Sequence, residues 1–509
     1  MLERSTAGLK ATLQTAGLSR PLALLVVADL SAKAFTLASF SLIARTLGAE
    51  AYGLLAWAQA LVSYGTLAEL GLTPFGARSI AAGPERLREW LRGVLRLRCL
   101  FSAGAVALLL AAAVWIDDPV KTPVIVLAAT WLLASMLNLE WVVQGLGRPE
   151  LVGLSRITGA VGLFGSVLVW RASSRGLLAA ASLRTLSELA AVALLIWMVR
   201  RSWPAKSFAA NTPALSMRRL MTEAAPFMGG SLCTFFYAAN LDLVLLAAFR
   251  PPAVVGCYAA AFRLYLICAI LPKLMLVAFY PVFARQDLSG ETLAVRWRQF
   301  LSVSLLFGMP VAVLAGVASG DVMEVIYGAG FLGGAVPLRI LAIGGAAAVL
   351  NGGLVALLMA RGCARQGVIC SAGGMAVNLV VNLAGVARFG EIASASAVAA
   401  AELTVLLLAA WQVRRHLGLL PWGSPGSLAS AIPAGAVLAT TCGMKMWLDP
   451  LVPGAISRLV AIAAAGGVVW LLALAALPRL SNWSSHSRAD GREPVTGPNA
   501  ERRMLSAER

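Results

Sequence analysis

The sequence predicts an all-α integral membrane protein with about fourteen transmembrane helices, on the strength of three observations. First, 59% of the 509 residues are hydrophobic and only 13% are charged, whereas soluble globular proteins carry about 25% charged residues. Second, apolar runs of about 20 residues, the length that spans a bilayer as a helix, recur along the chain. Third, lysine and arginine gather in alternate connections between those runs, which is typical of a polytopic membrane protein.

With a span length of about 20 residues, the chain contains fourteen apolar segments. No gap between them is large enough for a folded domain outside the membrane. The fifth and sixth segments are interrupted by charged residues. The tail from Ser481 onward is polar and patternless, which predicts disorder. The segments are 22–46, 51–71, 94–116, 121–144, 150–171, 176–199, 222–248, 253–280, 299–320, 335–360, 367–387, 392–413, 428–448 and 455–478.

The distribution of arginine predicts the orientation. The connections at 73–98 and 200–219 are rich in arginine. Alternate connections are poor in it: the stretch DDPVK at 117–121 is net acidic, and Asp321 and Glu324 have no basic residue near them in the sequence. Because positively charged connections stay on the cytoplasmic side, this alternation predicts that both termini are cytoplasmic.

The composition excludes several classes of function. The net charge of +18 comes from short segments between apolar runs, so we expect no nucleic-acid-binding domain. The seven cysteines never form a CxxC motif, and we interpret them as small hydrophobic residues. The only histidines, His416 and His486, lie in polar connecting or tail sequence, which disfavours histidine catalysis. Phosphate-loop and dinucleotide motifs are absent in any credible strand–helix context. We therefore expect no cofactor and no hydrolysis of ATP by this chain.

Four stretches carry a resemblance to a known family: ARTLGAEAYGLLAWAQALVSYGTLAELGLTPFGARSIA (44–81), EWVVQGLGRPELVG (140–153), NLDLVLLAAFRPPAVVGCYAAAFRLY (240–265) and VIYGAGFLGGAVPLRILAIGG (325–345). They resemble the bacterial polysaccharide-unit flippases, the Wzx-type members of the multidrug/oligosaccharidyl-lipid/polysaccharide exporter superfamily. The resemblance covers about residues 20 to 415. Many such flippases have twelve spans, so the last two segments are extra, as in the related lipid II flippases. The branch of the superfamily therefore stays open.

The resemblance implies two six-helix lobes around a central cavity, plus two extra C-terminal helices. A short repeat agrees with this duplication, since SRITGAV (155–161) and SAGGMAV (371–377) share Ser, Ala and Val in register. Transporters built from repeats place their substrate between the repeats, near the bilayer midplane. The expected divisions are a cytoplasmic N-terminus at 1–20, an N-lobe at 21–200, a cytoplasmic linker at 201–221, a C-lobe at 222–415, helices 13 and 14 at 428–478, and a disordered cytoplasmic tail at 481–509.

The function that the resemblance implies is that of a flippase in the bacterial plasma (inner) membrane. It would move undecaprenyl-diphosphate-linked oligosaccharide units from the cytoplasmic to the periplasmic leaflet by alternating access, driven by an ion gradient or the membrane potential. Its expected partners are this polyprenyl-diphosphate-linked glycan, membrane lipids, and polysaccharide polymerase and chain-length machinery. One alternative is a drug/cation antiporter of the same superfamily, whose cavity should be dominated by acidic residues. Another is a membrane polymerase or ligase, but such enzymes usually need substantial outer loops, and the outer connections here are short.

Several charged residues lie within the apolar segments, where each costs roughly 2.5–3.5 kcal/mol at the bilayer centre. Arg156, Arg263 and Glu402 have no opposite charge three or four residues away, which favours positions facing a watery cavity. Arg263 lies about 15 Å deep at the helical rise. Because the arginine fork binds phosphate with two hydrogen bonds, we expect Arg45, Arg78, Arg156 and Arg263 to attract a diphosphate. Arg45 and Arg78 lie at loop edges, where they can instead serve only orientation.

Other charged residues have two open interpretations. Asp29 and Lys33 are four residues apart in the favourable acid-first order, and Arg184 and Glu188 are four apart in the reverse order. Each pair can neutralise itself within its helix, or its members can face the cavity. Glu140 lies close enough to the end of a segment to reach the polar headgroups.

The stretch FFYAANLDLVLLAAF (235–249) places Asn240 and Asp242 within an apolar run. Two residues apart, they point about 200° from one another, and Asp242 is the better cavity candidate. Asn378 and Asn382 are four apart and share a face. A carboxylate and two amide oxygens suit a hard cation, and the resemblance implies sodium between spans 7, 11 and 12, as in some lipid II flippases. The alternative is hydrogen bonding between helices; the coupling ion, sodium or proton, stays open.

Overall fold

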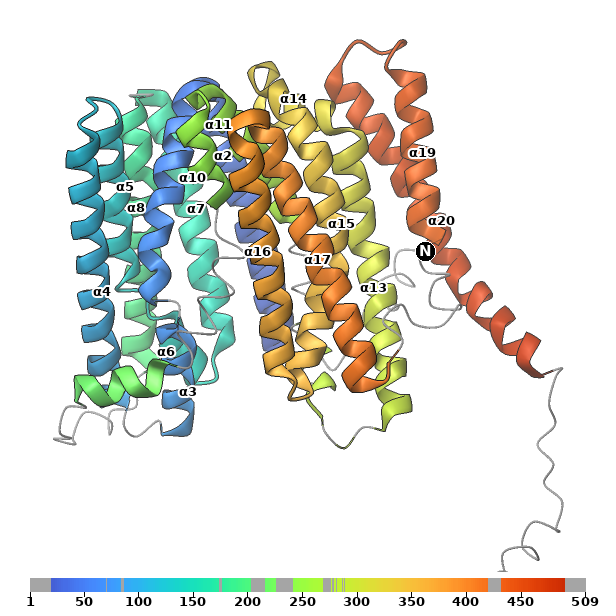
Figure 1. The fold of residues 1–509 in the computed structure, drawn as a ribbon, viewed down its shortest axis with the longest axis horizontal. Coiled ribbons are helices and arrows are strands. Elements are labelled where there is room, and N and C mark those ends of the chain that lie inside the picture. Colours follow the sequence, from blue (N-terminus) through green and yellow to red (C-terminus); the bar gives the residue numbers. More distant parts are fainter. Residues whose placement is uncertain are drawn as a thin grey trace, which may run out of the picture.

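The computed structural model describes residues 20–69, 71–83, 87–173, 176–202, 216–225, 241–268, 289–419 and 432–489, with short pieces between 276 and 287. Within these residues the chain is built of helices joined by short connections, and no strand occurs (Figure 1). This confirms the all-α class. Asn240, the N-terminus to residue 19, most of the predicted linker and the tail from residue 490 lie outside the described residues.

The first half of the chain follows the predicted segments with one interruption. α2 turns at Gly48, whose φ of 77° is a conformation that favours glycine, and its two limbs match the first two predicted segments. The fourth predicted segment is broken, since one helix ends at Ser135 and the next begins at Glu140. The helices are α2 (Arg20–Ser63), η1 (Tyr64–Glu69), α3 (Leu72–Ala82), α4 (Leu87–Ile116), α5 (Lys121–Ser135), α6 (Glu140–Gly145), α7 (Pro149–Ser173) and α8 (Leu177–Ser202).

The second half begins with a short helix at 217–225. α14 is a separate nine-residue segment, because Ala318 and Gly328 on either side of it leave helical geometry. The last helix runs past Ser481, where disorder was predicted; 481–489 contains no Gly or Pro, so an existing helix propagates through it. The helices are α10 (Leu241–Phe249), α11 (Pro252–Cys268), α13 (Gly290–Val317), α14 (Ser319–Tyr327), η4 (Ala329–Gly334), α15 (Ala335–Ala360), α16 (Ala364–Phe389), α17 (Glu391–Leu417), α19 (Ile432–Leu448) and α20 (Ala455–Ala489).

Every predicted segment overlaps a helix, but the described residues hold ten helices that are long and apolar enough to cross a membrane. Two causes lower the number. The two limbs of α2 count as one helix although the backbone turns at Gly48, and the described parts of segments 7, 8 and 13 are short. The chain is a multi-pass membrane protein of helices; the count of fourteen and the lobe boundaries stay predictions.

Two groups of helices lie side by side in Figure 1. α4, α5, α7 and α8 pack with α2 in one half, and α13, α15, α16 and α17 pack together in the other. The halves meet through α2 and α11. A Cβ atom added to Gly53 of α2 would come within 1.8 Å of the Pro252 carbonyl oxygen, and one on Gly256 of α11 within 2.0 Å of the Ala49 oxygen. The two backbones are therefore in direct contact.

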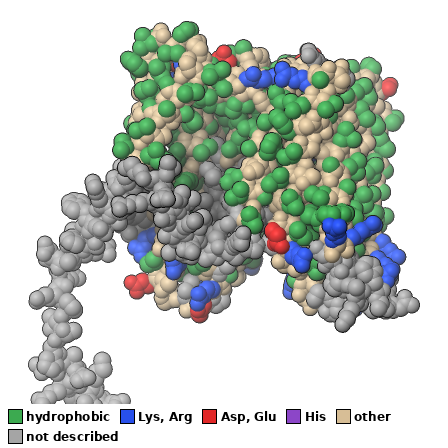
Figure 2. All heavy atoms as spheres, turned by 180° about the vertical axis from the view of Figure 1, so that it is seen from behind, with side chains coloured by type: hydrophobic (Ala, Val, Ile, Leu, Met, Phe, Trp, Pro, Cys, Tyr) green, Lys and Arg blue, Asp and Glu red, His purple; other side chains and the backbone are tan. Residues whose placement is uncertain are grey.

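The two ends of the bundle differ. The basic end, at the bottom of Figure 1, holds the α3–α4, α6–α7 and α15–α16 connections; the opposite end holds Gly48, the α4–α5 and α10–α11 connections and α14. At the opposite end the Tyr52 ring packs against those of Tyr327 and Phe331, with centroids 6.4 and 5.7 Å away. At the basic end the outline of the molecule is notched between its halves (Figure 2). The halves are thus joined at the opposite end.

Candidate functional site

Arg263 lies at the contact between the halves, about 16 Å along α11 from the opposite end. Its Nη2 donates to Oε1 of Gln59 at 3.0 Å, and its guanidinium carbon lies 3.2 Å from the centroid of the Phe40 ring. Both partners belong to α2 and both are neutral. The half-buried Arg263 side chain therefore points across α11 into the first half of the chain, and not toward lipid.

A second arginine lies in the same region on α8. The guanidinium carbon of Arg184 lies 3.7 Å from the centroid of the Trp131 ring, and its charge interacts with that of Arg263. Glu188 is within electrostatic range of Arg184, yet its oxygens accept from Asn138 Nδ2 at 3.1 Å and Trp131 Nε1 at 3.5 Å. The described residues give no direct Arg184–Glu188 ion pair. Arg184 and Arg263, which we call the central pair, bring two positive charges together from the two halves.

Arg156 is engaged by two carboxylates. Its Nη1 donates to Asp29 Oδ1 of α2 at 3.0 Å and its Nη2 to Glu140 Oε2 of α6 at 3.1 Å. This Arg156 triad corrects two expectations: Asp29 pairs across helices and not with Lys33, and Glu140 turns to Arg156 and not to headgroups. The Arg156 side chain is still 43% exposed, and Lys33 is exposed on α2. The triad as a whole carries no excess positive charge.

The residues proposed for an ion site have separate partners. Asp242, buried in the first turn of α10, accepts from the hydroxyl of Tyr258 on α11. Asn382 donates to Asn378 Oδ1 at 3.2 Å and accepts from the Ser394 hydroxyl of α17 at 3.0 Å. Within the described part of the chain, no hydrogen bond joins Asp242 to either asparagine. The Asn382–Ser394 bond ties α16 to α17, as the interhelical alternative expects.

Glu402 forms a second buried carboxylate site, also reached by a tyrosine of α11. Its oxygens accept from the Tyr265 hydroxyl and from the side-chain amide of Asn351 on α15. The side chain is 7% exposed. Glu402 thus joins α11, α15 and α17 in the second half of the chain, in place of the open cavity position expected for it.

Arg45 belongs to the closed contact at the opposite end. Its Nε donates to the Ile326 carbonyl at 2.9 Å and its Nη2 to that of Val325. Ser41, one turn earlier on α2, also donates to Ile326. These carbonyls form the last turn of α14, the negative end of the helix dipole, which suits a guanidinium. Arg78 lies exposed on α3. Neither Arg45 nor Arg78 adjoins the central pair among the contacts described.

The spacing of two tyrosines in the sequence could have identified functional residues that the sequence analysis missed. Tyr258 and Tyr265 are seven residues apart, two helical turns, and so share one face of α11; both reach a buried carboxylate in the second half. Arg263, between them, faces α2. The amphipathic division of α11 could have been found from this spacing. Gln59 and Trp131 gave no such signal, because their roles depend on partners on other helices.

A protein-family model described as "Polysaccharide biosynthesis protein" matches residues 19–286, more than half of the chain. This range includes both arginines of the central pair, the Arg156 triad and all of α11. Among curated protein sequences, none matches the chain.

Solved structures share the fold. The lipid II flippase MurJ in an inward closed conformation matches with a TM-score of 0.66 and 14% identity, over 90% of this chain and 99% of its own. A MATE family multidrug resistance transporter of the MOP superfamily, inward-facing, matches with a TM-score of 0.57 and 12% identity, over 77% and 94%. A mutant of the Vibrio cholerae MATE transporter VcmN matches with a TM-score of 0.54 and 18% identity, over 81% and 99%. At these identities the likeness establishes the fold alone.

Proposed function

Because the chain belongs to the polysaccharide biosynthesis protein family, we propose that it is a flippase for undecaprenyl-diphosphate-linked oligosaccharides in the bacterial inner membrane. One observation carries this proposal: the central pair. Two guanidinium groups, one from each half, lie close enough for their charges to interact. The groups that bind Arg263 are neutral. Two like charges inside a membrane protein are costly. Glu188 offsets part of the charge of Arg184, and a substrate anion between the two arginines would offset the rest.

A diphosphate suits the central pair better than a single carboxylate. It carries at least two negative charges, so each guanidinium can bind one phosphate group through charge-assisted hydrogen bonds. It also lies between a lipid and a glycan. The polyprenyl tail can therefore remain in the bilayer while the diphosphate and the sugars occupy the contact between the halves.

Groups beside the central pair are suited to a glycan. The hydroxyls of Thr130 on α5 and Thr185 on α8 lie 2.7 Å apart, both half-buried. Trp131 presents a ring and Asn138 an amide in the same region. Hydroxyls and amides can hydrogen-bond with sugar hydroxyls, and an aromatic ring can stack on the apolar face of a sugar. These contacts tolerate different sugar units, so the glycan identity is not fixed by them.

The proposed cycle is alternating access. The opposite end is closed by the α2–α14 contacts of Arg45 and Ser41, and the notch lies at the basic end (Figure 2). If the basic end is cytoplasmic, as its arginine content favours, this form accepts substrate from the inside. The coupling ion in this proposal is either sodium, at Asp242, Asn378 and Asn382, or a proton, and a polysaccharide polymerase is a proposed partner.

The two alternative functions fit the residues less well. A drug/cation antiporter needs carboxylates where its substrate binds, but Asp242 and Glu402 are buried and bonded to tyrosines of α11, while arginines lie between the halves. For a polymerase or ligase, the short connections of the opposite end provide little room for a catalytic loop. We therefore assign transport and no enzymatic step.

The proposal is tested by replacing Arg263 with alanine in cells that depend on this protein for surface glycan. We expect export to be lost while the amount of protein in the membrane is unchanged, because the diphosphate loses one of its two cations. Arg339→Ala is the matched control, since Arg339 is exposed on α15 and should leave export intact. Normal export by the Arg263→Ala variant would remove the central pair from the mechanism.

A further inference from the structure

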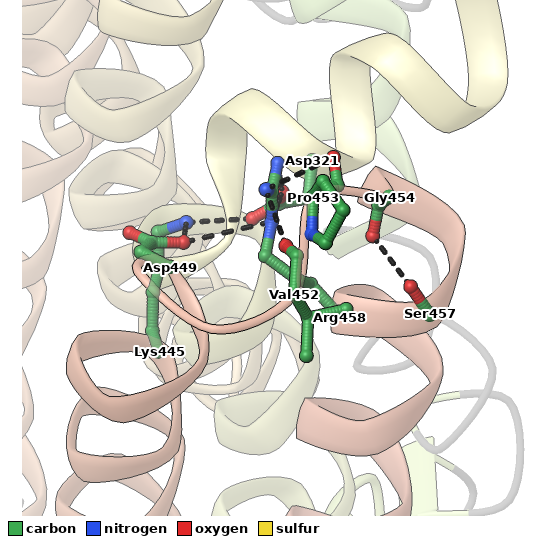
Figure 3. Close-up of polar contacts among 8 residues, drawn as sticks. All are labelled: Asp321, Lys445, Asp449, Val452, Pro453, Gly454, Ser457 and Arg458. Atoms are coloured by element: carbon green, nitrogen blue, oxygen red, sulfur yellow. Dashed lines mark hydrogen bonds and ion pairs between the residues drawn. The ribbon is translucent and has the colours of Figure 1, made fainter.

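The two C-terminal helices are tied to α14 by buried charges. Asp321 of α14 accepts from Lys445 Nζ of α19 at 2.6 Å and from Arg458 Nε of α20 at 2.8 Å (Figure 3). Its side chain is 1% exposed. The sequence placed no base near Asp321, because its two partners lie 124 and 137 residues away. We call Asp321, Lys445 and Arg458 the outer clamp.

Other contacts hold the same two helices without help from the outer clamp. Trp470 of α20 donates to the Leu306 carbonyl of α13 at 2.8 Å, and its ring lies edge-on to Phe307 with centroids 5.4 Å apart. α19 packs along α13 as well. Arg458 also bonds the Val452 carbonyl at 3.0 Å, which fixes the α19–α20 turn internally. Attachment of this hairpin therefore does not explain why the outer clamp reaches α14.

α14 is a short helix that buries Val322, Met323 and Tyr327 in the hydrophobic core. It is nine residues long and is separated from its neighbours by Ala318 and by Gly328, whose φ is 96°. Its first turn carries Asp321 and its last turn the carbonyls that accept from Arg45 and Ser41 of α2. One end of this short helix thus meets the C-terminal hairpin, and the other end meets the first half of the chain.

We propose that the outer clamp positions α14 for closure of the opposite end, so that Asp321 is a positioning residue of the transport cycle. This rests on the proposed alternating access. With the clamp formed, the last turn of α14 is held where Arg45 and Ser41 can reach its carbonyls. Without it, apolar packing alone holds the first turn of α14, the helix can tilt about Ala318 and Gly328, and the α2–α14 contact weakens. The C-terminal helices then act on the closure through α14, although none of their residues takes part in the closing contact.

The charge state of Asp321 agrees with this role. Asp321 lies between the spanning helices α13 and α15, outside both. Burial raises its pKa, but hydrogen bonds from Lys445 and Arg458 outweigh burial and leave the pKa below its ordinary value. The carboxylate is therefore charged at neutral pH. Asp449, which contacts both bases at 3.1 and 3.6 Å, is the other charged group of the cluster.

The test measures a distance across the opposite end. Spin labels are placed at Glu50→Cys, on the second limb of α2, and Leu332→Cys, on η4, in a chain whose seven native cysteines have been replaced. Both positions are exposed. Double electron–electron resonance then reports the distance distribution without any substrate. We expect Asp321→Asn to add a longer-distance population that is several-fold larger than in the otherwise unaltered labelled chain.

Two further variants make the result decisive. Asp449→Asn removes a charge from the same cluster without touching α14, and should leave the distribution unchanged. The triple variant Asp321→Asn, Lys445→Gln, Arg458→Gln leaves no buried charge without a partner, since the remaining carboxylate, Asp449, has a side chain that is 47% exposed. It therefore serves where the single variant fails to fold, and it should show the longer population. An unchanged distribution in both Asp321 variants, or an equal change with Asp449→Asn, would overturn the proposal. Loss of glycan transport alone would not overturn the proposal, because the distance between the labels is measured without substrate.

Discussion

At the residue scale, the neighbouring side chains decide what an arginine in an apolar segment can do. Arg156 and Arg263 look alike in the sequence, each in an apolar segment with no opposite charge one turn away. Arg156 meets Asp29 and Glu140, which more than balance its charge. Arg263 meets Gln59 and Phe40, which leave its charge in place. Of these two arginines, Arg263 alone therefore keeps an excess positive charge, although both were predicted to attract a diphosphate.

The Arg156 triad should act in stability more than in substrate binding. Arg156→Ala leaves Asp29 and Glu140 facing each other without a cation. We expect a loss of about 1–3 kcal/mol in the free energy of unfolding, less than for a fully buried pair because Arg156 is partly exposed. Replacing all three residues, as Asp29→Asn, Glu140→Gln and Arg156→Met, leaves no charged side chain of the triad without a partner. This triple variant should recover most of that loss. Thermal unfolding in detergent measures both; equal losses in the two variants would contradict the ion-pair account.

At the element scale, helices were predictable and their contacts were not. Apolar length located the segments, and the turn at Gly48 fell in the predicted gap between the first two. The break between α5 and α6 was missed because Asn138, whose side-chain oxygen accepts from the Glu140 backbone N–H at 2.8 Å, gives no strong signal in an apolar run. The partners of Asp29 and Asp321 were missed because they lie more than 100 residues away. Sequence spacing detects partners on one helix only.

The contact of α2 with α11 gives a prediction at this scale. A methyl group at Gly256 would meet the Ala49 carbonyl oxygen at 2.0 Å, and neither backbone can yield without separating the helices. We expect Gly256→Ala to lower the unfolding temperature and to reduce export. Gly104→Ala is the control: nothing lies within 4 Å of its added Cβ in α4, and alanine should gain up to about 1 kcal/mol in a helix. Equal unfolding temperatures for the two variants would contradict the close contact.

At the scale of the whole molecule, α11 lies where the parts of the proposed mechanism meet. One face carries Tyr258 and Tyr265, which bind the buried carboxylates of the second half; another carries Arg263, which faces α2. A change at Asp242 or Glu402 could therefore move Arg263 relative to Arg184. The fold class followed from the sequence, and so did the proposal that Arg263 takes part in substrate binding. Arg184 as its counterpart did not, because only the folded chain brings the two halves together.

The central claim, that the central pair holds a diphosphate during transport, is tested most directly in liposomes containing the purified protein. The rates of flipping are compared for a sugar linked to the same polyprenyl chain through a diphosphate or through a monophosphate. We expect the unaltered protein to flip the diphosphate form at least tenfold faster, and an Arg184→Gln, Arg263→Gln variant to lose that preference. Equal rates for the two lipids, or a preference that survives in the double variant, would contradict the account.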